Sequence, residues 1–418
     1  MPPPSVAVIG GGVGGTLASL ALRSRGIAPT IFDSSSRLGG RSTAGHFLAA
    51  RSPHVGDVTR TLEGAGLLRK WTGRFGVLGG KGGFIDAASF NLAQGKKKRP
   101  QPGEPDPPTP HTDTGDFCGF LDHSMEDVYC APGGFSALCR GVVEMAGIET
   151  RLSARVEKAE WSEELGKWRL SVAGGGGGGE KEGEGAPAES TFDAVIFAAH
   201  DPSLAASAIS SISLPPGHDP AVASRLSTLS SDLRALRLSR TSPVITARIT
   251  YPQGSLDRVP FDCATLPADP ALQFLVREAS KAGGGASGAS AEGDLWTAVT
   301  TSTFAKIHVP HTCSPLPPID EVTSTVVGGV SRSLAPFFGG AASNVPTPLT
   351  ATAKVWRAGF TTSSLIPPTV PGEAVIELEP WRMAVAGDFV RTAGSPGEAA
   401  AAAGLAAGES VARWFGEQ

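Results

Sequence analysis

The sequence predicts an α/β protein in which a parallel-sheet domain carries an inserted α+β domain with a mixed or antiparallel sheet. Three observations lead to this fold class. A glycine-rich turn follows a buried strand near the amino end, an acidic residue ends the next strand about 20 residues later, and apolar strands return in the middle and near the carboxyl end. Because distant segments then contribute strands to one sheet, the chain should form two interleaved domains.

Composition excludes several classes of function. The 418 residues suffice for two or three domains, and 36 basic against 40 acidic side chains give a net charge of -4. The charged fraction of 18% lies below the roughly 25% of an average domain, so no nucleic-acid-binding surface is expected. The eight histidines are dispersed, which argues against a metal site.

Cysteine usage and the length of apolar runs bear on location. The five cysteines never approach a CxxC spacing, which indicates neither a disulfide framework nor a zinc site. No apolar stretch reaches the roughly 18 residues that a membrane span needs. We therefore expect a soluble protein of a reducing compartment, in the cytoplasm or an organelle stroma or matrix, and the amino end shows no targeting peptide.

The first element is a strand–turn–helix unit. Residues 6–9 are an apolar, β-branched run typical of a buried strand, and an amphipathic stretch begins at Thr16. Between them, Gly10 permits a tight turn, Gly12 lets the backbone approach a pyrophosphate, and Gly15 allows close packing of helix on strand. The helix start, with Val13 and Gly14, offers free N–H groups and a positive dipole end. The alternative is an ordinary glycine-rich loop.

The second element is a strand over residues 29–32 that ends at Asp33 and Ser34. A carboxylate here can accept hydrogen bonds from ribose hydroxyls, so the unit predicts a Rossmann-type dinucleotide site. A further glycine turn follows, Gly39-Gly40, flanked by the guanidinium groups of Arg37 and Arg41. Guanidinium groups suit a pyrophosphate, and this additional clamp favours FAD over NAD.

Together these motifs resemble those of the flavin-containing amine oxidase superfamily, and the resemblance implies that this chain binds FAD. No cysteine lies in a flavin-linking setting, so we expect the FAD to be bound noncovalently. Residues 128–138 and 192–199 resemble segments of its FAD domain, and Val156 resembles the residue whose backbone meets adenine. Near the carboxyl end, Gly387-Asp388 and a helix starting around Glu398 and Ala399 resemble the closing FAD motif. The positive end of that helix would stabilise reduced flavin. Asp388 would form a hydrogen bond on the pyrophosphate or ribityl side of FAD. The alternative for Asp388 is a helix N-cap or an ordinary loop carboxylate.

A narrower comparison concerns residues 272–281 and 295–302, which resemble the paired strands of renalase-like proteins. The resemblance implies oxidation of an amine or a dihydronicotinamide by hydride transfer to flavin N5, with O2 as acceptor and H2O2 as product. The substrate face differs from these relatives, because the chain has no Asp-His pair near His46, Val299 in place of a histidine, and Lys354-Val355-Trp356-Arg357 in place of His-Arg-Trp.

The expected domains are discontinuous. Residues 1–48, 129–205 and 351–418 should form the FAD domain, and residues 49–128 and 206–350 the substrate domain. Segments 94–114, 174–190 and 281–293 read as loops because they are rich in glycine, proline or charged residues.

No catalytic residue is certain from the sequence, because hydride transfer to flavin requires no obligatory base. Four candidates stand out. Lys281 would hold a water near N5, although its setting before a glycine-rich loop favours a surface lysine, and His46 would be a polar contact or an ordinary loop histidine. Trp356 and Arg357 would form a wall for a flat substrate or simply pack in the core.

Two other functions fit the same motifs. One is a flavin dehydrogenase or desaturase that acts on an apolar metabolite and passes electrons to another acceptor. The other is a flavin-binding protein without turnover, with FAD as a structural ligand or redox sensor, which the altered substrate face favours. In each case the partners are small molecules, with neither nucleic acid nor a membrane span involved.

Overall fold

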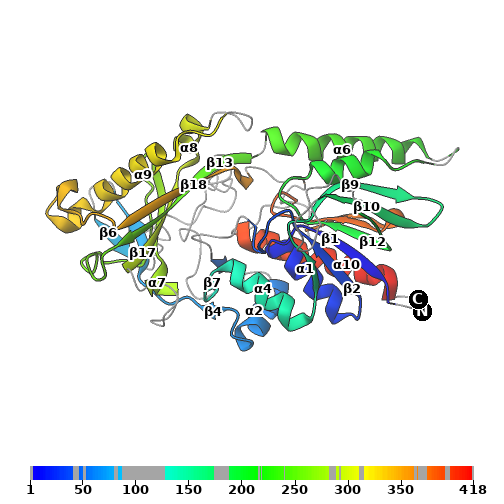
Figure 1. Ribbon diagram of the computed structural model, residues 1–418, viewed down its shortest axis with the longest axis horizontal. Helices are drawn as coiled ribbons and strands as arrows, with labels where there is room; N and C mark the ends of the chain where they lie inside the picture. Colours follow the sequence, from blue (N-terminus) through cyan, green and yellow to red (C-terminus); the bar gives the residue numbers. More distant parts are fainter. Residues whose placement is uncertain are drawn as a thin grey trace, which may run out of the picture.

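The structure is a computed structural model that describes residues 3–40, 47–49, 53–79, 83–86, 128–173, 188–214, 217, 219–239, 241–281, 289–290, 293–309, 315–361, 365, 374–390 and 396–416. Arg41, His46 and the expected loop 94–114 lie outside these ranges. The elements form two lobes with the amino and carboxyl ends at the far side of one of them (Figure 1).

The first lobe contains a six-stranded sheet in the order β19-β20-β12-β1-β2-β8. Every pairing is parallel except that of β19 with β20, so the expected parallel sheet is confirmed. Its strands are β1 (Ser5–Ile9), β2 (Ala28–Phe32), β8 (Glu149–Arg151), β12 (Ala194–Phe197), β19 (Ile376–Leu378) and β20 (Met383–Val385).

The two faces of this sheet are covered by different layers, as the alternation of side chains along β1 requires. Val6 and Val8 pack into a core shared with four helices, which are α1 (Val13–Ser24), α2 (Pro53–Gly64), α4 (Phe135–Ala146) and α10 (Pro396–Gly416). Ala7 and Ile9 pack into a second core. That core is closed by a three-stranded antiparallel sheet and two helices, which are β9 (Arg155–Ser162), β10 (Lys167–Ala173), β11 (Ala188–Phe192), α5 (Ser203–Ser210) and α6 (Pro220–Ser239).

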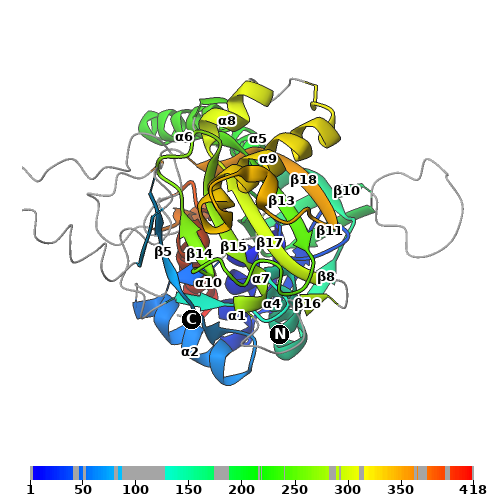
Figure 2. The same ribbon diagram turned by 90° about the vertical axis from the view of Figure 1, so that its left-hand side faces the viewer.

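The second lobe is built on an eight-stranded, mainly antiparallel sheet in the order β18-β13-β17-β15-β14-β5-β6, with β16 paired to β17 (Figure 2). Its strands are β5 (Phe75–Leu78), β6 (Phe84–Asp86), β13 (Thr241–Tyr251), β14 (Cys263–Thr265), β15 (Leu272–Arg277), β16 (Ala289–Ser290), β17 (Gly293–Thr300) and β18 (Thr350–Thr361). We call this the mixed-sheet lobe, because β5 and β14 pair in parallel.

Helices cover one face of this sheet, and a small sheet from the other lobe covers part of the opposite face. The core between this sheet and its helices contains residues of α9 (Ile319–Leu334) and α8 (Ser302–His308), with the short helices η2 (Ala335–Phe338) and η3 (Ala342–Asn344). The opposite face packs on a three-stranded sheet in the order β3-β7-β4. Its strands are β3 (Leu48–Ala49), β7 (Val128–Cys130) and β4 (Arg69–Lys70).

Three segments lie with different partners from those expected. Helix α2 packs in the helical core of the parallel-sheet lobe, and α6 packs beside α5 in the same lobe. Strand β18 pairs with β13 and so belongs to the mixed-sheet lobe, although the sequence placed residues from 351 onward with the nucleotide-binding segments. Sequence reasoning missed the placements of α2 and β18 because their partners lie far away in the chain, whereas α6 follows α5 directly and was separated from it by the expected boundary at residue 205. Within the described ranges, no helix has the length and apolarity that crossing a membrane requires.

Candidate dinucleotide site and the facing sheet

The glycine turn between β1 and α1 is packed tightly at some positions and open at one. A Cβ added at Gly15 would overlap the carbonyl oxygen of Gly10, and one at Gly10, where φ is +113°, would lie 2.8 Å from the carbonyl carbon of Ala198. A Cβ at Gly12 would meet no described atom within 4 Å. The turn is therefore shaped so that only Gly12 of these three borders open space.

Gly12 is also the N-cap of α1, and no side chain caps this helix. The first N–H groups of a helix have no intrahelical partner, and the helix dipole places partial positive charge there. The start of α1, with Val13 and Gly14, thus offers an uncapped, electropositive backbone beside an open space. This arrangement fits the pyrophosphate of a dinucleotide, and a side chain at Gly12 would occupy that space.

Asp33, at the end of β2, is held against the glycine turn. Its Oδ2 accepts a hydrogen bond from the Gly11 N–H at 2.6 Å, and its Oδ1 accepts one from the Ser35 N–H at 2.8 Å. Each carboxylate oxygen keeps a second lone pair for another donor. The carboxylate is half-buried and fixed in orientation, and Ser34 beside it is exposed.

The second glycine turn lies directly on the first. Gly39 and Gly40 both have positive φ, and the Gly39 N–H donates to the Gly11 carbonyl at 2.8 Å. The hydroxyl of Ser136, at the start of α4, donates to the carbonyl of Leu38 at 2.6 Å. These bonds hold the backbone of the second turn against the first, and the side chain of Arg37, which precedes that turn, is exposed. The position of Arg41 lies outside the described residues.

Val156 lies in β9 close to the end of β2. The Ala154 N–H donates to the carbonyl of Asp33 and the Ser153 N–H donates to that of Ser35, both at 2.9 Å. The side chain of Val156 is buried in the second core. Its backbone is therefore near Asp33, as an adenine contact would require.

The closing segment brings a second helix start to the same edge of the sheet. Gly387 has φ of +156°, and Asp388 is 4% exposed and accepts a hydrogen bond from the Thr361 hydroxyl at 3.3 Å. Helix α10 begins at Pro396, so Asp388 is not its N-cap. A Cβ at Gly14 would lie 3.0 Å from the carbonyl oxygen of Ala400, which places the starts of α1 and α10 side by side.

Glu398 and Ala399 are buried in the first turn of α10. An acidic side chain in the first turn is favoured by the helix dipole. The beginnings of two helices therefore direct positive dipole ends toward the carboxyl end of β1. An anionic ligand bound at this edge would be stabilised by both.

The face of the mixed sheet turned toward the β3-β7-β4 sheet is largely apolar. Val244, Phe274, Val276 and Val299 pack there with Phe47, and Trp356 lies partly buried against them. The indole N–H of Trp356 donates to the hydroxyl of Thr246 at 3.0 Å. Trp356 thus lies on this apolar face, and its half-buried neighbour Arg357 follows it in the strand. A wall for a flat substrate at these two residues stays a prediction.

Lys281 is buried, with only 8% of its surface exposed, which corrects the expectation of a surface lysine. It ends the short helix α7 (Glu278–Lys281), and its ammonium bonds the Glu278 carboxylate at 2.8 and 3.0 Å. Thr297 Oγ1 donates to the same carboxylate at 2.6 Å. The Glu278 pKa lies below its ordinary value, because the attraction of Lys281 and these hydrogen bonds outweigh the burial that raises it.

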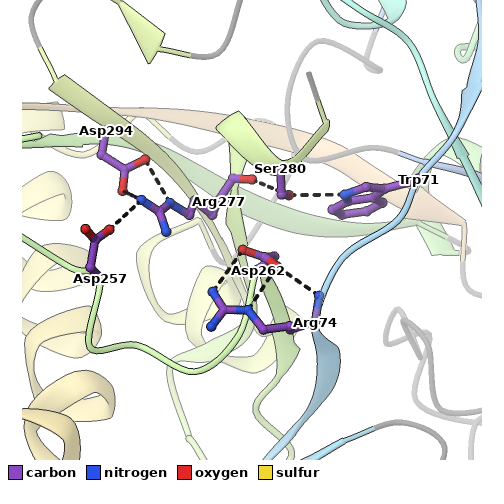
Figure 3. Close-up of polar contacts among 7 residues, drawn as sticks. All are labelled: Trp71, Arg74, Asp257, Asp262, Arg277, Ser280 and Asp294. Carbon is purple, nitrogen blue, oxygen red and sulfur yellow. Dashed lines mark hydrogen bonds and ion pairs between the residues drawn. The ribbon is translucent and has the colours of Figure 1, made fainter. Parts of the chain in front are cut away.

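Neighbouring contacts fix α7 in place. The indole N–H of Trp71 donates to Ser280 Oγ at 3.1 Å, and Ser280 in turn donates to the carbonyl of Arg277 (Figure 3). The carbonyl of Lys281 accepts from Arg69 Nε at 2.7 Å. Arg69 belongs to β4 of the small sheet, so Lys281 joins the two lobes through its backbone and binds Glu278 through its side chain.

The thiols of the described part of the chain are protonated at neutral pH. Burial raises the pKa of Cys139 to about 11 and raises the pKa values of Cys130 and Cys263. Because the thiolate is the reactive form, these three cysteines are poor candidates for a covalent link to a cofactor.

Comparison with known proteins supports the fold. A family model described as an NAD(P)-binding Rossmann-like domain matches residues 8–59. A search of curated proteins finds no match. Among solved structures, an oxidoreductase from Methanosarcina mazei is 14% identical with a TM-score of 0.60, over 96% of this chain and 99% of that one.

Two amine oxidases have the same architecture along nearly their whole length. Cyclohexylamine oxidase from Brevibacterium oxydans has a TM-score of 0.57 at 13% identity, over 99% of this chain and 100% of that one. Putrescine oxidase bound to putrescine has a TM-score of 0.53 at 14% identity, over 98% of both chains. The chain therefore has the two-lobed fold of these amine oxidases.

Sequence reasoning missed three participants in this region. Ser136 anchors the second glycine turn, Glu278 pairs with Lys281, and Lys354 lies on the same face of β18 as Trp356. The signals for two of them were present. Glu278 and Lys281 are three residues apart, and Lys354 and Trp356 are two apart, which places them on one face of a strand.

Proposed function

We propose that this protein is an FAD-dependent oxidoreductase of the amine oxidase type. The observation that carries the proposal is the open space at Gly12, bordered by the uncapped start of α1, the oriented carboxylate of Asp33 and the second glycine turn. An ADP moiety has the ribose hydroxyls and the negative charge that these groups would recognise. The shared fold with two amine oxidases supports the same proposal.

The residues divide the work of holding FAD. The N–H groups at Gly12, Val13, Gly14 and Gly15 would face the pyrophosphate, helped by Arg37 and Arg41 and by the second turn at Gly39 and Gly40. Gly10, whose N–H donates to the Phe32 carbonyl at 2.8 Å, would shape the turn. Asp33, with Ser34, would bind the adenosine ribose, and the Val156 backbone would meet adenine. Gly387, Asp388, Glu398 and Ala399 would line the flavin end.

Bound FAD would supply a two-electron acceptor at N5, with O2 as the final acceptor and H2O2 as the product. The protein's own task is then to orient the donor, exclude water and control charge. The apolar sheet face with Trp356 suits a flat donor, and we propose an amine or a dihydronicotinamide, as in renalase-like proteins. The protonated, buried thiols favour noncovalent FAD.

A flavin-binding protein without turnover is the second candidate. It is favoured by the pairing of Lys281 with Glu278, because two of the three N–H donors of that ammonium are used by the carboxylate. A structural or redox-sensing FAD would require only the cofactor half of the site.

The cofactor site is tested by Gly12→Asp. Asp is a favoured N-cap residue and Gly12 borders open space, so the variant should fold with an unchanged melting temperature. Its carboxylate would repel the pyrophosphate, and we expect flavin bound after saturation with FAD and gel filtration to fall at least tenfold. Gly12→Ala, which adds volume without charge, should lose less. Unchanged flavin content in Gly12→Asp would sink the proposal.

A further inference from the structure

The strand order of the parallel sheet places three groups of the candidate cofactor site in a row. Strands β2, β1, β12 and β20 are neighbours and parallel, so their carboxyl ends share one edge of the sheet. Asp33 follows β2, the open space at Gly12 follows β1, and Asp388 follows β20. Because β12 lies between β1 and β20, and neighbouring strands are about 4.8 Å apart, Asp388 lies roughly 10 Å beyond the glycine turn. An extended dinucleotide that begins at Asp33 and crosses Gly12 would therefore bring its far half to Asp388.

Asp388 is fixed by the fold around it. The Ala386 N–H donates to the carbonyl of Phe197 at 2.8 Å, which holds the end of β20 on β12. The Val390 N–H donates to the carbonyl of Gly387 at 3.1 Å and closes a tight turn that contains Asp388. With 4% of its surface exposed, Asp388 needs hydrogen-bond donors from the protein or a ligand, because little water reaches its carboxylate.

One such donor comes from the other lobe. Thr361 ends β18 of the mixed-sheet lobe, and its hydroxyl donates to Asp388 Oδ2 at 3.3 Å. Four residues further on, the Leu365 N–H donates to the carbonyl of Phe389 at 2.9 Å. The segment that leaves β18 therefore contacts the Asp388 turn twice, once through a side chain and once through the backbone. Because the backbone bond does not involve the Thr361 hydroxyl, this hydroxyl can be removed while that contact between the lobes stays in place.

We propose that Thr361 is a positioning residue for the flavin half of FAD. Its hydroxyl orients the Asp388 carboxylate, which would then accept hydrogen bonds from the cofactor half that carries the ribityl hydroxyl groups. ADP ends at the pyrophosphate and has no group in this half. The proposal rests on the proposed function and adds a residue of the mixed-sheet lobe to the cofactor site. Removal of the hydroxyl should therefore weaken the binding of FAD and leave the binding of ADP unchanged.

The test compares FAD with ADP on the full-length apoprotein, by flavin fluorescence for FAD and by isothermal titration calorimetry for ADP. Thr361→Val keeps the shape of the side chain and removes the hydroxyl. We expect its Kd for FAD to rise about fivefold, the effect of one hydrogen bond, and its Kd for ADP to stay within about twofold of wild type. Thr361→Ser keeps a hydroxyl and should restore the affinity for FAD. The matched control is Thr352→Val, at an exposed threonine of the same strand, which should change neither affinity.

Three outcomes would overturn the proposal. The first is an unchanged Kd for FAD in Thr361→Val. The second is an equal loss of FAD and ADP affinity in that variant, which would indicate a structural effect on the whole site. The third is a Thr361→Ser variant as weak as Thr361→Val. Failure of the proposed function would be seen separately, because the wild-type protein would then bind neither FAD nor ADP.

Discussion

At the residue scale, the glycines of the first turn have different tasks although the sequence shows them as one motif. Gly10 and Gly15 have no room for a side chain, whereas Gly12 borders open space. The GxGxxG spacing predicted these separate roles, because each follows from how a strand, a turn and a helix must meet. The geometry of the turn agrees with that prediction, while FAD binding itself stays a proposal.

The Lys281–Glu278 pair shows where residue-level prediction ends. The glycine-rich stretch after Lys281 suggested exposure, but burial depends on Trp71, Cys130 and Thr297, which come from three distant parts of the chain. No local pattern indicates that these groups meet. The sequence therefore identified Lys281 as a candidate but did not predict that it is buried and paired with Glu278.

Removing one member of this pair should cost stability. Lys281→Met leaves the Glu278 carboxylate buried without its cation, and we expect a loss of about 3 kcal/mol in the free energy of unfolding at pH 7. The double variant Lys281→Met/Glu278→Gln should recover most of this loss. Urea unfolding of the single and double variants measures both. Equal stability of wild type and Lys281→Met would contradict the role assigned to the pair.

The same pair should make stability depend on pH. The Glu278 pKa is lower in the folded protein than in the unfolded chain, so its contribution is present above the unfolded value of about 4.3. It is lost as the pH falls through the folded pKa. The stability difference between wild type and Lys281→Met, measured by urea unfolding, should therefore shrink in acid, because a protonated Glu278 no longer needs the Lys281 cation.

At the element scale, the strands of the parallel sheet were the most predictable parts. Residues 6–9, 29–32 and 194–197 are apolar runs, and all three lie in strands of one sheet, whereas Phe192, which the sequence placed in the last of these strands, ends β11 of the three-stranded sheet. The membership of β18 was not predictable in this way. Its partner β13 begins more than 100 residues earlier, and pairing at that separation has no local signal.

Helices α1 and α10 pack through small residues, and this contact supports both helix starts at the site. A Cβ at Gly404 would overlap the carbonyl oxygen of Gly14, and one at Gly408 would overlap that of Ala18. The alanine-rich composition of α10 is explained by this close approach. The sequence indicated a helix here, but not that α1 was its partner.

Gly404→Ala should therefore separate the two helices. We expect it to destabilise the protein by about 2 kcal/mol, because the overlap is with backbone that cannot move aside locally. Gly328→Ala in α9 is the matched control. Its Cβ would lie 3.5 Å from the flexible end of Arg332, so higher helix propensity should leave stability equal or increased by up to about 1 kcal/mol. Thermal unfolding compares them, and equal effects would contradict this packing.

At the scale of the whole molecule, the sequence predicted two interleaved lobes, and the structure has a parallel-sheet lobe and a mixed-sheet lobe. The cofactor half of the candidate site was predictable because it consists of contiguous motifs. The facing half was not, because Trp356, Lys354 and the Lys281–Glu278 pair are brought together by strand register and lobe packing. The substrate class stays a proposal, because it depends on how the cofactor half and the facing half of the candidate site meet.

The most direct test of the account is the visible absorption spectrum of the FAD-saturated protein without oxygen, before and after addition of amines and dihydronicotinamides. We predict flavin bands that bleach with one class of donor and return on admission of air, with H2O2 formed. A protein that shows no flavin bands even after incubation with FAD would contradict the central claim. Bands that never bleach with either class would contradict the proposed oxidation and favour a flavin-binding protein without turnover.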